Sequence, residues 1–323
     1  MTVDNPANGI LTPPRMGDLA DQLEGAIGTM RQWGIRIPPT SRLPEIVKLL
    51  RELVSEESFP ECASRRAMIA QAARDAQEFV EISWVLPDER LRPLRRNLQQ
   101  AVFGTLGHTR DRAYQYQSEL WTGATLTRSG AFTGVRMDGP EGTNPDFILK
   151  NATKEYAVEV KRPANLDRAR DRVSKAANQL RNSRYHGGLI VVDLTDCLDP
   201  ESRDLSGRGP FNTARRTRVA AKVEELTNAV RKKVFDDSSE RIRRRWSHVF
   251  GLVSFVRTTW WDLDDLWQMH LLRYVLRIHF WRGVKDLRYW RAQWLAELIE
   301  RGIGETGHQD MGGGEIAFDR SRG

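Results

Sequence analysis

The sequence has few of the residues that mark secreted, membrane-spanning or disulfide-rich proteins. Among 323 residues there are 2 cysteines, Cys62 and Cys197, which lie far apart and do not have the spacing of metal ligands. We therefore expect both thiols to be reduced and buried. No apolar run approaches the roughly 20 residues that cross a membrane. The N-terminus does not show the basic and then apolar pattern of a signal peptide, and so we expect a cytoplasmic protein.

Motifs that read a DNA sequence are absent as well. The chain contains no helix-turn-helix pattern, no zinc-finger spacing and no internal repeat. His270 and His279 do not follow the HExxH pattern of a metalloprotease, which favours histidines of the core or of an interface. Recognition of one specific DNA site is therefore not expected.

Positive charge is in excess and is unevenly distributed. The chain carries 50 Lys and Arg against 43 Asp and Glu, a formal net charge of +7, and its pI is about 9.6. Residues 1–105 hold 13 basic and 14 acidic side chains, whereas the rest of the chain holds 37 and 29. Such an excess suits a polyanionic partner such as nucleic acid. A solvated basic surface is the alternative that charge alone leaves open.

Residues 17–105 are expected to form an all-helical module, after a loose leader at 1–16. Three prolines and the lack of an apolar period predict the leader. Apolar residues at helical spacing then predict four helices, at 18–33, 41–54, 64–86 and 88–103. The module contains no metal, phosphate or nucleophile motif. We interpret it either as a binding region for a protein partner or a second copy of the chain, or as a buttress packed on the rest of the protein.

A β-hairpin is predicted in the middle of the chain. Two short apolar runs, Phe147–Leu149 and Tyr156–Val160, flank a polar turn. Because strand side chains alternate between faces, Glu159 and Lys161 share one face of the second strand, and Tyr156, Val158 and Val160 share the other. Asp146 begins the partner strand, so the hairpin is expected to bring it close to Glu159.

Two acids and a lysine at adjoining strand ends favour a Mg²⁺ site. Asp146 and Glu159 supply the hard oxygen ligands that Mg²⁺ requires, and Mn²⁺ is the expected substitute. A bound metal acidifies water and neutralises charge on phosphorus. Lys161 would hold that water or stabilise the developing negative charge. The alternative is an ordinary hairpin with one exposed Glu–Lys pair.

At these residues the chain resembles the PD-(D/E)xK nuclease superfamily, which has the restriction-endonuclease-like fold. Pro145-Asp146 matches the first half of the motif and Glu159-Val160-Lys161 the second. The resemblance covers roughly residues 110–195. It implies an α/β (mixed α+β) fold in which helices flank a central mixed β-sheet, within a nuclease domain at 106–300. The order strand, strand, helix, strand expected between 147 and 194 agrees with this core.

The resemblance also implies further site residues. The backbone carbonyl of Val160 would be a metal ligand. Glu119, on a helix predicted over 111–128, would lend a third acid, unless it is an exposed or capping glutamate. Gln179, on a helix predicted over 166–181, would stand near Lys161, unless it faces solvent. No tyrosine follows at the spacing of the RecB-like branch, which argues against membership of that branch.

Beyond the hairpin the sequence predicts a buried strand at 188–194, a long helix at 211–235 and a strand at 249–258. Residues 266–281 fit either a strand pair or a helix. The glycine-rich residues 301–323 are expected to be disordered. Basic side chains of the region are candidates for contacts to nucleic-acid phosphates: Arg162, Lys175, Arg215, Arg216, Arg218 and Lys222.

The sequence thus predicts a Mg²⁺-dependent nuclease that hydrolyses phosphodiester bonds, with DNA as the expected substrate. Defence against foreign DNA and DNA repair are biological roles that would fit. The alternative is a nuclease-like module that binds nucleic acid or a protein without cutting it, because a fold does not determine a function.

Overall fold

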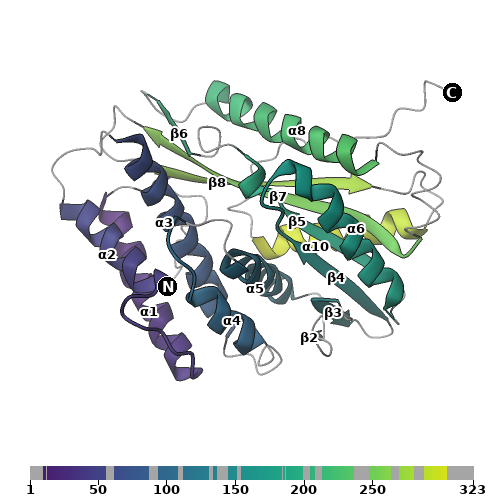
Figure 1. The fold of residues 1–323 in the computed structure, drawn as a ribbon, viewed down its shortest axis with the longest axis horizontal. Coiled ribbons are helices and arrows are strands. Elements are labelled where there is room, and N and C mark those ends of the chain that lie inside the picture. Colours follow the sequence, from purple (N-terminus) through teal and green to yellow (C-terminus); the bar gives the residue numbers. More distant parts are fainter. Residues whose placement is uncertain are drawn as a thin grey trace. The chain divides into compact units, whose positions relative to one another are not determined.

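The computed structural model describes residues 10–11, 13–55, 62–86, 94–107, 112–130, 134–136, 145–150, 154–183, 185, 187–198, 204–207, 213–235, 247–262, 269–279 and 287–303 (Figure 1). They form two compact units. The first comprises Met1–Ala124, Leu198–Lys222 and Arg257–Arg273, and the second comprises Thr125–Cys197, Val223–Val256 and Tyr274–Gly323. The boundary expected at residues 105 and 106 does not coincide with this division.

Helices make up most of the first unit. The predicted helices are confirmed as α1 (Pro13–Gln32), α2 (Arg42–Ser55), α3 (Ala63–Ser83) and α4 (Arg95–Val102), followed by the first part of α5 (Arg112–Arg128). Strand β6 (Asp204–Gly207) pairs in parallel with the end of β7 (Val249–Asp262). The beginning of α8 (Thr213–Phe235) also belongs to this unit.

The expected loose leader is wrong for residues 10–16. Strand β1 (Ile10–Leu11) pairs antiparallel with β8 (Met269–His279), with Leu11 opposite Met269. Helix α1 then begins at Pro13. Proline is well tolerated in the first turn of a helix, where its missing N–H has no intrahelical partner. The two prolines were therefore a start signal and not a sign of irregular chain.

Helix α3 is enclosed on all sides from Ile69 to its end, although its sequence is rich in polar residues. Every side chain from Ile69 to Ser83 is buried. Arg257 forms an ion pair with Glu78 inside the unit, and Gln117 Nε2 donates to Glu78 Oε2 at 2.7 Å and to Asp75 Oδ1 at 3.1 Å. Buried charges persist only where such partners are supplied. The helix is thus a central element of the first unit.

A mixed β-sheet forms the core of the second unit. Strand β2 (Gly134–Arg136) pairs antiparallel with β3 (Phe147–Lys150), and β3 pairs antiparallel with β4 (Glu155–Lys161). Strand β5 (Gly188–Asp193) then runs parallel to β4 and to the first part of β7. The predicted hairpin and the order strand, strand, helix, strand are confirmed. The protein is a mixed α/β protein with an N-terminal helical region and a mixed sheet flanked by helices.

Helices pack against the sheet of this unit. Helix α6 (Leu166–Asn182) connects β4 to β5 and packs against both strands (Figure 1). Its N-cap is Asn165, whose side chain accepts a hydrogen bond from the Arg168 N–H at 3.0 Å. Helix α10 (Leu287–Ile303) meets the sheet through Trp294, whose ring lies 5.8 Å from that of Tyr156. Helix α10 was not predicted from the sequence.

The structure also tests the expectations for residues 266–281, for the two cysteines and for the tail. Residues 269–279 form one strand, so the helix is wrong and the described residues show a single strand in place of a strand pair. Cys62 is exposed, so the expectation of two buried thiols is wrong for it, and Cys197 is partly buried. No helix within the described ranges is long and apolar enough to cross a membrane. Residues 301–303 belong to the helix at Leu287–Ile303, so the expected disorder is wrong for them, and the rest of the tail lies outside the described residues. The side chains of His270 and His279 also lie outside them.

Gly188 makes the close approach of β4 and β5 possible, and its replacement by alanine should be costly. A Cβ at this position would lie 2.0 Å from the carbonyl oxygen of Ala157, which is backbone and cannot move aside. We expect Gly188→Ala to lower the free energy of unfolding by about 2–3 kcal/mol, measured by urea denaturation. Gly28→Ala is the matched control, because no atom lies within 4 Å of its added Cβ. That variant should gain about 0.5–1 kcal/mol from helix propensity, and equal effects of the two changes would contradict the packing argument.

Candidate functional site

The hairpin brings three predicted site residues into contact at one end of β4. Lys161 Nζ donates to Glu159 Oε2 at 2.6 Å and lies 3.5 Å from Asp146 Oδ2. Asp146 Oδ2 also accepts a hydrogen bond from the Val160 N–H at 2.7 Å. Asp146, Glu159 and Lys161 therefore form one cluster of two acids and a lysine, which we call the acid–lysine cluster.

The strand register explains why these residues meet. Phe147 lies opposite Val158, so the next position outward places Asp146 beside Glu159. The alternation of β4 puts Tyr156 on the opposite face. There Tyr156 packs edge-on against Phe250, at 6.2 Å between ring centroids, and against Trp294. The aromatic contacts thus hold one face of β4 while the acid–lysine cluster occupies the other.

Glu159 is fully buried, which changes its acidity. Burial, followed by the negative charge of Asp146, raises the pKa of Glu159 from 4.5 to about 9, although Lys161 acts in the opposite direction. Its Oε2 is held by Lys161, but its Oε1 has no hydrogen-bond partner among the described residues. A buried carboxylate with an unsatisfied oxygen is costly for the fold and is typical of a functional site.

The raised pKa of Glu159 predicts that Glu159→Gln stabilises the metal-free protein at alkaline pH. The folded protein keeps a proton that the unfolded chain releases above pH 4.5. This contribution to stability is complete below pH 4.5 and is lost as the pH rises toward about 9. Glutamine resembles the protonated acid and does not titrate. In EDTA we expect the melting temperature of Glu159→Gln to rise relative to that of the wild type by several degrees between pH 4.5 and pH 8.5, because only the wild type loses stability over this range.

Glu52→Gln serves as the control, because Glu52 is an exposed acid that pairs with Lys48 at 3.6 Å. The difference in melting temperature between Glu52→Gln and the wild type should not grow with pH as it does for Glu159→Gln. A Glu159→Gln difference that stays constant between pH 4.5 and 8.5 would show that Glu159 titrates at its ordinary value.

The acid–lysine cluster fits a divalent cation. Asp146 and Glu159 offer carboxylate oxygens at the same place, and a cation would relieve both their repulsion and the unsatisfied Oε1. Within the described residues no group of three or more His, Cys, Asp or Glu side chains is placed to hold a metal. The pair would therefore rely on water, substrate or backbone oxygens for its other ligands. The predicted role of the Val160 carbonyl stays a prediction, while the Val160 N–H supports Asp146.

Glu119 and Gln179 were expected to join this site. Glu119 belongs to the first unit and is buried there. Its carboxylate accepts hydrogen bonds from Asn97 at 3.0 Å and from Gln115 at 2.8 Å. The alternative of an exposed glutamate is therefore wrong, and its role as a third acid stays a prediction. Gln179 is half-buried on α6, and its role is likewise untested.

Arg162 has a different environment from the one expected. It was a candidate for phosphate contact, but the side chain is buried and paired with acids of this chain. Arg162 Nε and Nη2 donate to the two carboxylate oxygens of Asp196 at 2.6 and 3.0 Å, and Nη1 lies 3.3 Å from Asp193 Oδ2. We correct the expectation: a guanidinium held in this way is not displayed to solvent. Asp193 and Asp196 were not predicted as partners of Arg162, although Asp193 is visible in the sequence as an acid at the end of a buried strand.

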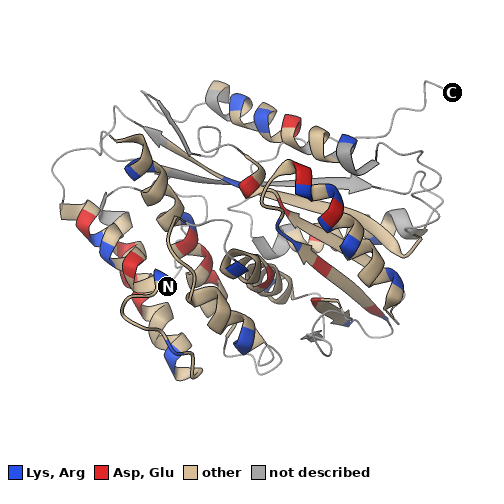
Figure 2. Ribbon diagram, in the orientation of Figure 1, with Lys and Arg blue, Asp and Glu red and all other residues tan. Residues whose placement is uncertain are grey.

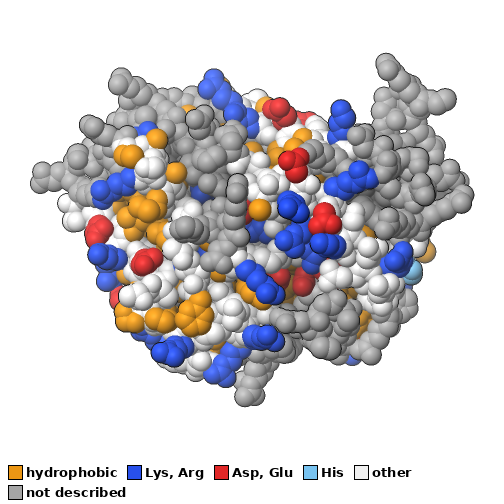
Figure 3. Space-filling model, viewed as in Figure 1, with side chains coloured by type: hydrophobic (Ala, Val, Ile, Leu, Met, Phe, Trp, Pro, Cys, Tyr) orange, Lys and Arg blue, Asp and Glu red, His pale blue; other side chains and the backbone are white. Residues whose placement is uncertain are grey.

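Basic side chains gather on the exposed face of α6, where Figure 3 shows several close together. This face carries Arg168, Arg170, Arg172 and Lys175. Acidic residues lie among these basic residues of α6 (Figure 2), and one of them, Asp171, pairs with Lys175 Nζ at 2.9 Å. On α8, Arg218 and Lys222 are exposed, and the side chains of Arg215 and Arg216 lie outside the described residues.

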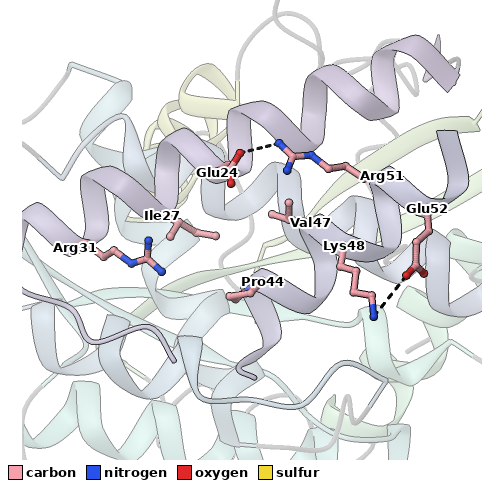
Figure 4. Close-up of a pocket in the computed structure, with 8 residues that line it drawn as sticks. All are labelled: Glu24, Ile27, Arg31, Pro44, Val47, Lys48, Arg51 and Glu52. Carbon is pink, nitrogen blue, oxygen red and sulfur yellow. Dashed lines mark hydrogen bonds and ion pairs between the residues drawn. The ribbon is translucent and has the colours of Figure 1, made fainter. Parts of the chain in front are cut away.

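A groove between α1 and α2 is a separate feature of the first unit (Figure 4). Its volume is about 400 Å³, and its apolar floor includes Ile27 and Val47. The rim carries both signs of charge, since Arg51 pairs with Glu24 at 2.7 Å and Lys48 pairs with Glu52. It holds no arrangement of nucleophile or base that would indicate catalysis, and the choice between a partner-binding region and a buttress remains open.

Comparisons with families of known proteins, with curated proteins and with solved structures find no match for this chain. What the chain does must therefore be argued from the fold and the acid–lysine cluster. Together they define a mixed α/β protein that presents two carboxylates and a lysine at the end of a β-hairpin.

Proposed function

We propose that the protein is a metal-dependent nuclease that hydrolyses phosphodiester bonds in DNA. The observation that carries the proposal is the contact of Lys161 Nζ with both Glu159 and Asp146 at the end of the β3–β4 hairpin. This set of side chains, on strands followed by a helix and a parallel strand, is similar to the PD-(D/E)xK superfamily and its restriction-endonuclease-like core. We therefore propose the restriction-endonuclease-like fold for this part of the chain as well.

Each member of the acid–lysine cluster has a role in this reaction. Asp146 and Glu159 would hold the cation, and the hydrogen bond from the Val160 N–H fixes the orientation of the Asp146 carboxylate. Mg²⁺ or Mn²⁺, when bound, supplies charge neutralisation at the phosphorus and a water of lowered pKa. Lys161 moves from the carboxylates to the attacking water or to the phosphoryl oxygen, where its charge stabilises the transition state. Burial of Glu159 limits the access of bulk water to these groups.

The charge distribution supports a nucleic-acid substrate. The exposed cations of α6 follow β4 directly in the chain, and Arg168, Arg172 and Lys175 recur at helical spacing. Exposed Arg and Lys side chains commonly contact phosphates, and phosphate contacts carry no information about the base sequence. A substrate recognised through its backbone, without one specific site, is the consistent choice.

The test uses supercoiled plasmid, linear duplex and single-stranded DNA, each incubated with Mg²⁺, with Mn²⁺ and with EDTA. We expect cutting that requires the metal and that is lost in Glu159→Ala/Lys161→Ala. The matched control is Lys48→Ala/Glu52→Ala, which removes an exposed acid–lysine pair from α2. It should cut as the wild type does.

Failure to cut any of these substrates, with DNA binding that persists in EDTA and weakens with salt, would overturn the proposal. That outcome would favour the alternative function, a nuclease-like module that binds nucleic acid without hydrolysing it. Equal cutting by the wild type and Glu159→Ala/Lys161→Ala would place the activity elsewhere in the chain.

A further inference from the structure

Two neighbouring chain segments are tied together just beyond the acid–lysine cluster. Strand β4 ends at Lys161 and β5 ends at Asp193, and Lys161 lies opposite Val192 in their parallel register. Arg162 therefore stands beside Asp193 at the point where both strands leave the sheet. The short helix η3 (Thr195–Cys197) follows and supplies Asp196.

The contacts among these residues are numerous and shielded from water. The planar guanidinium of Arg162 takes both oxygens of Asp196 and one of Asp193. Asp193 Oδ1 accepts the Thr195 N–H at 3.0 Å, which orients that carboxylate. The side chains of Arg162, Asp193 and Asp196 are 5%, 0% and 3% exposed, so the ion pairs are weakly screened by solvent. We call these three residues the arginine clamp.

The clamp acts on the residue that precedes it. Arg162 and Lys161 are adjacent, so a fixed Arg162 restricts the backbone from which the Lys161 side chain extends. Lysine has a long flexible side chain, and an error of about 1 Å in its placement can cost a large factor in rate. Bidentate pairing with a carboxylate is geometrically demanding and suits arginine, whereas lysine cannot reproduce it.

We propose that Arg162 is a positioning residue, and that the arginine clamp holds the end of β4 so that Lys161 can reach the reacting water or phosphate. This inference rests on the proposed nuclease function, and it replaces direct phosphate contact as the role of Arg162. The clamp holds β4 to the segment after β5 and makes no contact with the substrate.

Steady-state cleavage kinetics of Arg162→Lys, Asp196→Asn and the double variant test the clamp. We expect each single variant to lower kcat by about 10–100-fold, as supporting residues around a site commonly do. KM for DNA and its dependence on salt should stay the same, because no phosphate contact is lost. The double variant should be no slower than the slower single variant, since both changes break one unit. Arg181→Lys, an exposed arginine on α6, is the control and should leave kcat unchanged.

A rise in KM with a salt slope reduced by about 1 and an unchanged kcat would overturn the inference, because that pattern marks a lost phosphate contact. An unchanged kcat in Asp196→Asn would overturn it as well. Hydrogen exchange of the segment 156–165 gives a readout that does not need cleavage. Hydrogen exchange of this segment should become faster in both single variants. Unchanged exchange would show that the arginine clamp does not hold the end of β4, even if the wild type cuts DNA.

The two proposals fail in different ways. A wild-type protein that cuts no DNA contradicts the nuclease function, and the exchange data then decide by themselves whether the clamp fixes Lys161. A wild-type protein that cuts, with variants that keep kcat, contradicts the clamp and leaves the nuclease function in place.

Discussion

Replacing Lys161 by methionine is expected to abolish cleavage of DNA and at the same time to strengthen the binding of Mn²⁺. The rate should fall by about 10²–10³-fold or more, because a preorganised charge is lost from the transition state. In the metal-free protein, however, Lys161 Nζ already occupies the place between the two acids, 2.6 Å from Glu159 and 3.5 Å from Asp146. A divalent cation must displace it. Its removal should tighten Mn²⁺ binding by about tenfold, or about 1.4 kcal/mol, as measured by titration calorimetry.

The opposite signs of these two effects separate catalysis from metal binding. Lys175→Met offers a comparison, because Lys175 pairs with Asp171 on the surface and should not change Mn²⁺ affinity. Weaker Mn²⁺ binding in Lys161→Met would show that the lysine supports the metal and does not compete with it. Cleavage at the wild-type rate would remove Lys161 from the mechanism.

Replacing Arg257 by methionine is expected to be the most destabilising single change in the first unit. Arg257 is buried and forms an ion pair with Glu78, and Glu78 also accepts a hydrogen bond from Gln117. The variant would leave a buried carboxylate without its cation, which typically costs about 3–5 kcal/mol. The urea midpoint should fall accordingly, and Glu78→Leu/Arg257→Met should recover much of the loss because it removes both charges.

An exposed arginine provides the control for this prediction. Arg51 pairs with Asp21 at 2.8 Å and with Glu24 at 2.7 Å, but all three side chains are largely exposed. Arg51→Met should shift the midpoint little, since solvent and salt screen such pairs. If Arg51→Met and Arg257→Met lowered the midpoint equally, burial would not be the cause.

The buried contacts of Glu78 join residues that are distant in the sequence. Glu78 is on α3, Gln117 is on α5 and Arg257 is in the last part of β7, and all three belong to the first unit. Because the unit takes in segments from beyond residue 105, we expect 106–323 alone to lose these buried partners. The N-terminal helices are therefore an integral part of the first unit.

The acid–lysine cluster was accessible from the sequence because it depends on local rules. Alternation in a short strand places Glu159 and Lys161 on one face, and a hairpin returns Asp146 beside them whatever surrounds it. The helical stripes of α2 and α6 are local in the same sense, since a period of 3.6 residues is written along the chain. A run of apolar residues likewise marked β5 as a buried strand.

The surroundings of each charge were not accessible in this way. Arg162 looked like a surface cation in the sequence, and only the parallel register of β4 and β5 revealed that Asp193 and Asp196 hold it. Glu119 looked like a free acid, and Asn97 and Gln115 occupy it. The burial of α3 was equally hidden, because its partners come from segments far along the chain.

The sequence by itself therefore determined the hairpin, the pairing of two acids with a lysine and the alternation of helices and strands. The tertiary structure decided which charges face water and which are paired inside. The physical reason is range: strand alternation and helical periodicity act over a few residues, whereas the burial and partner of a charge depend on elements that are brought together only by folding. The raised pKa of Glu159 is the clearest case, since burial is its largest cause.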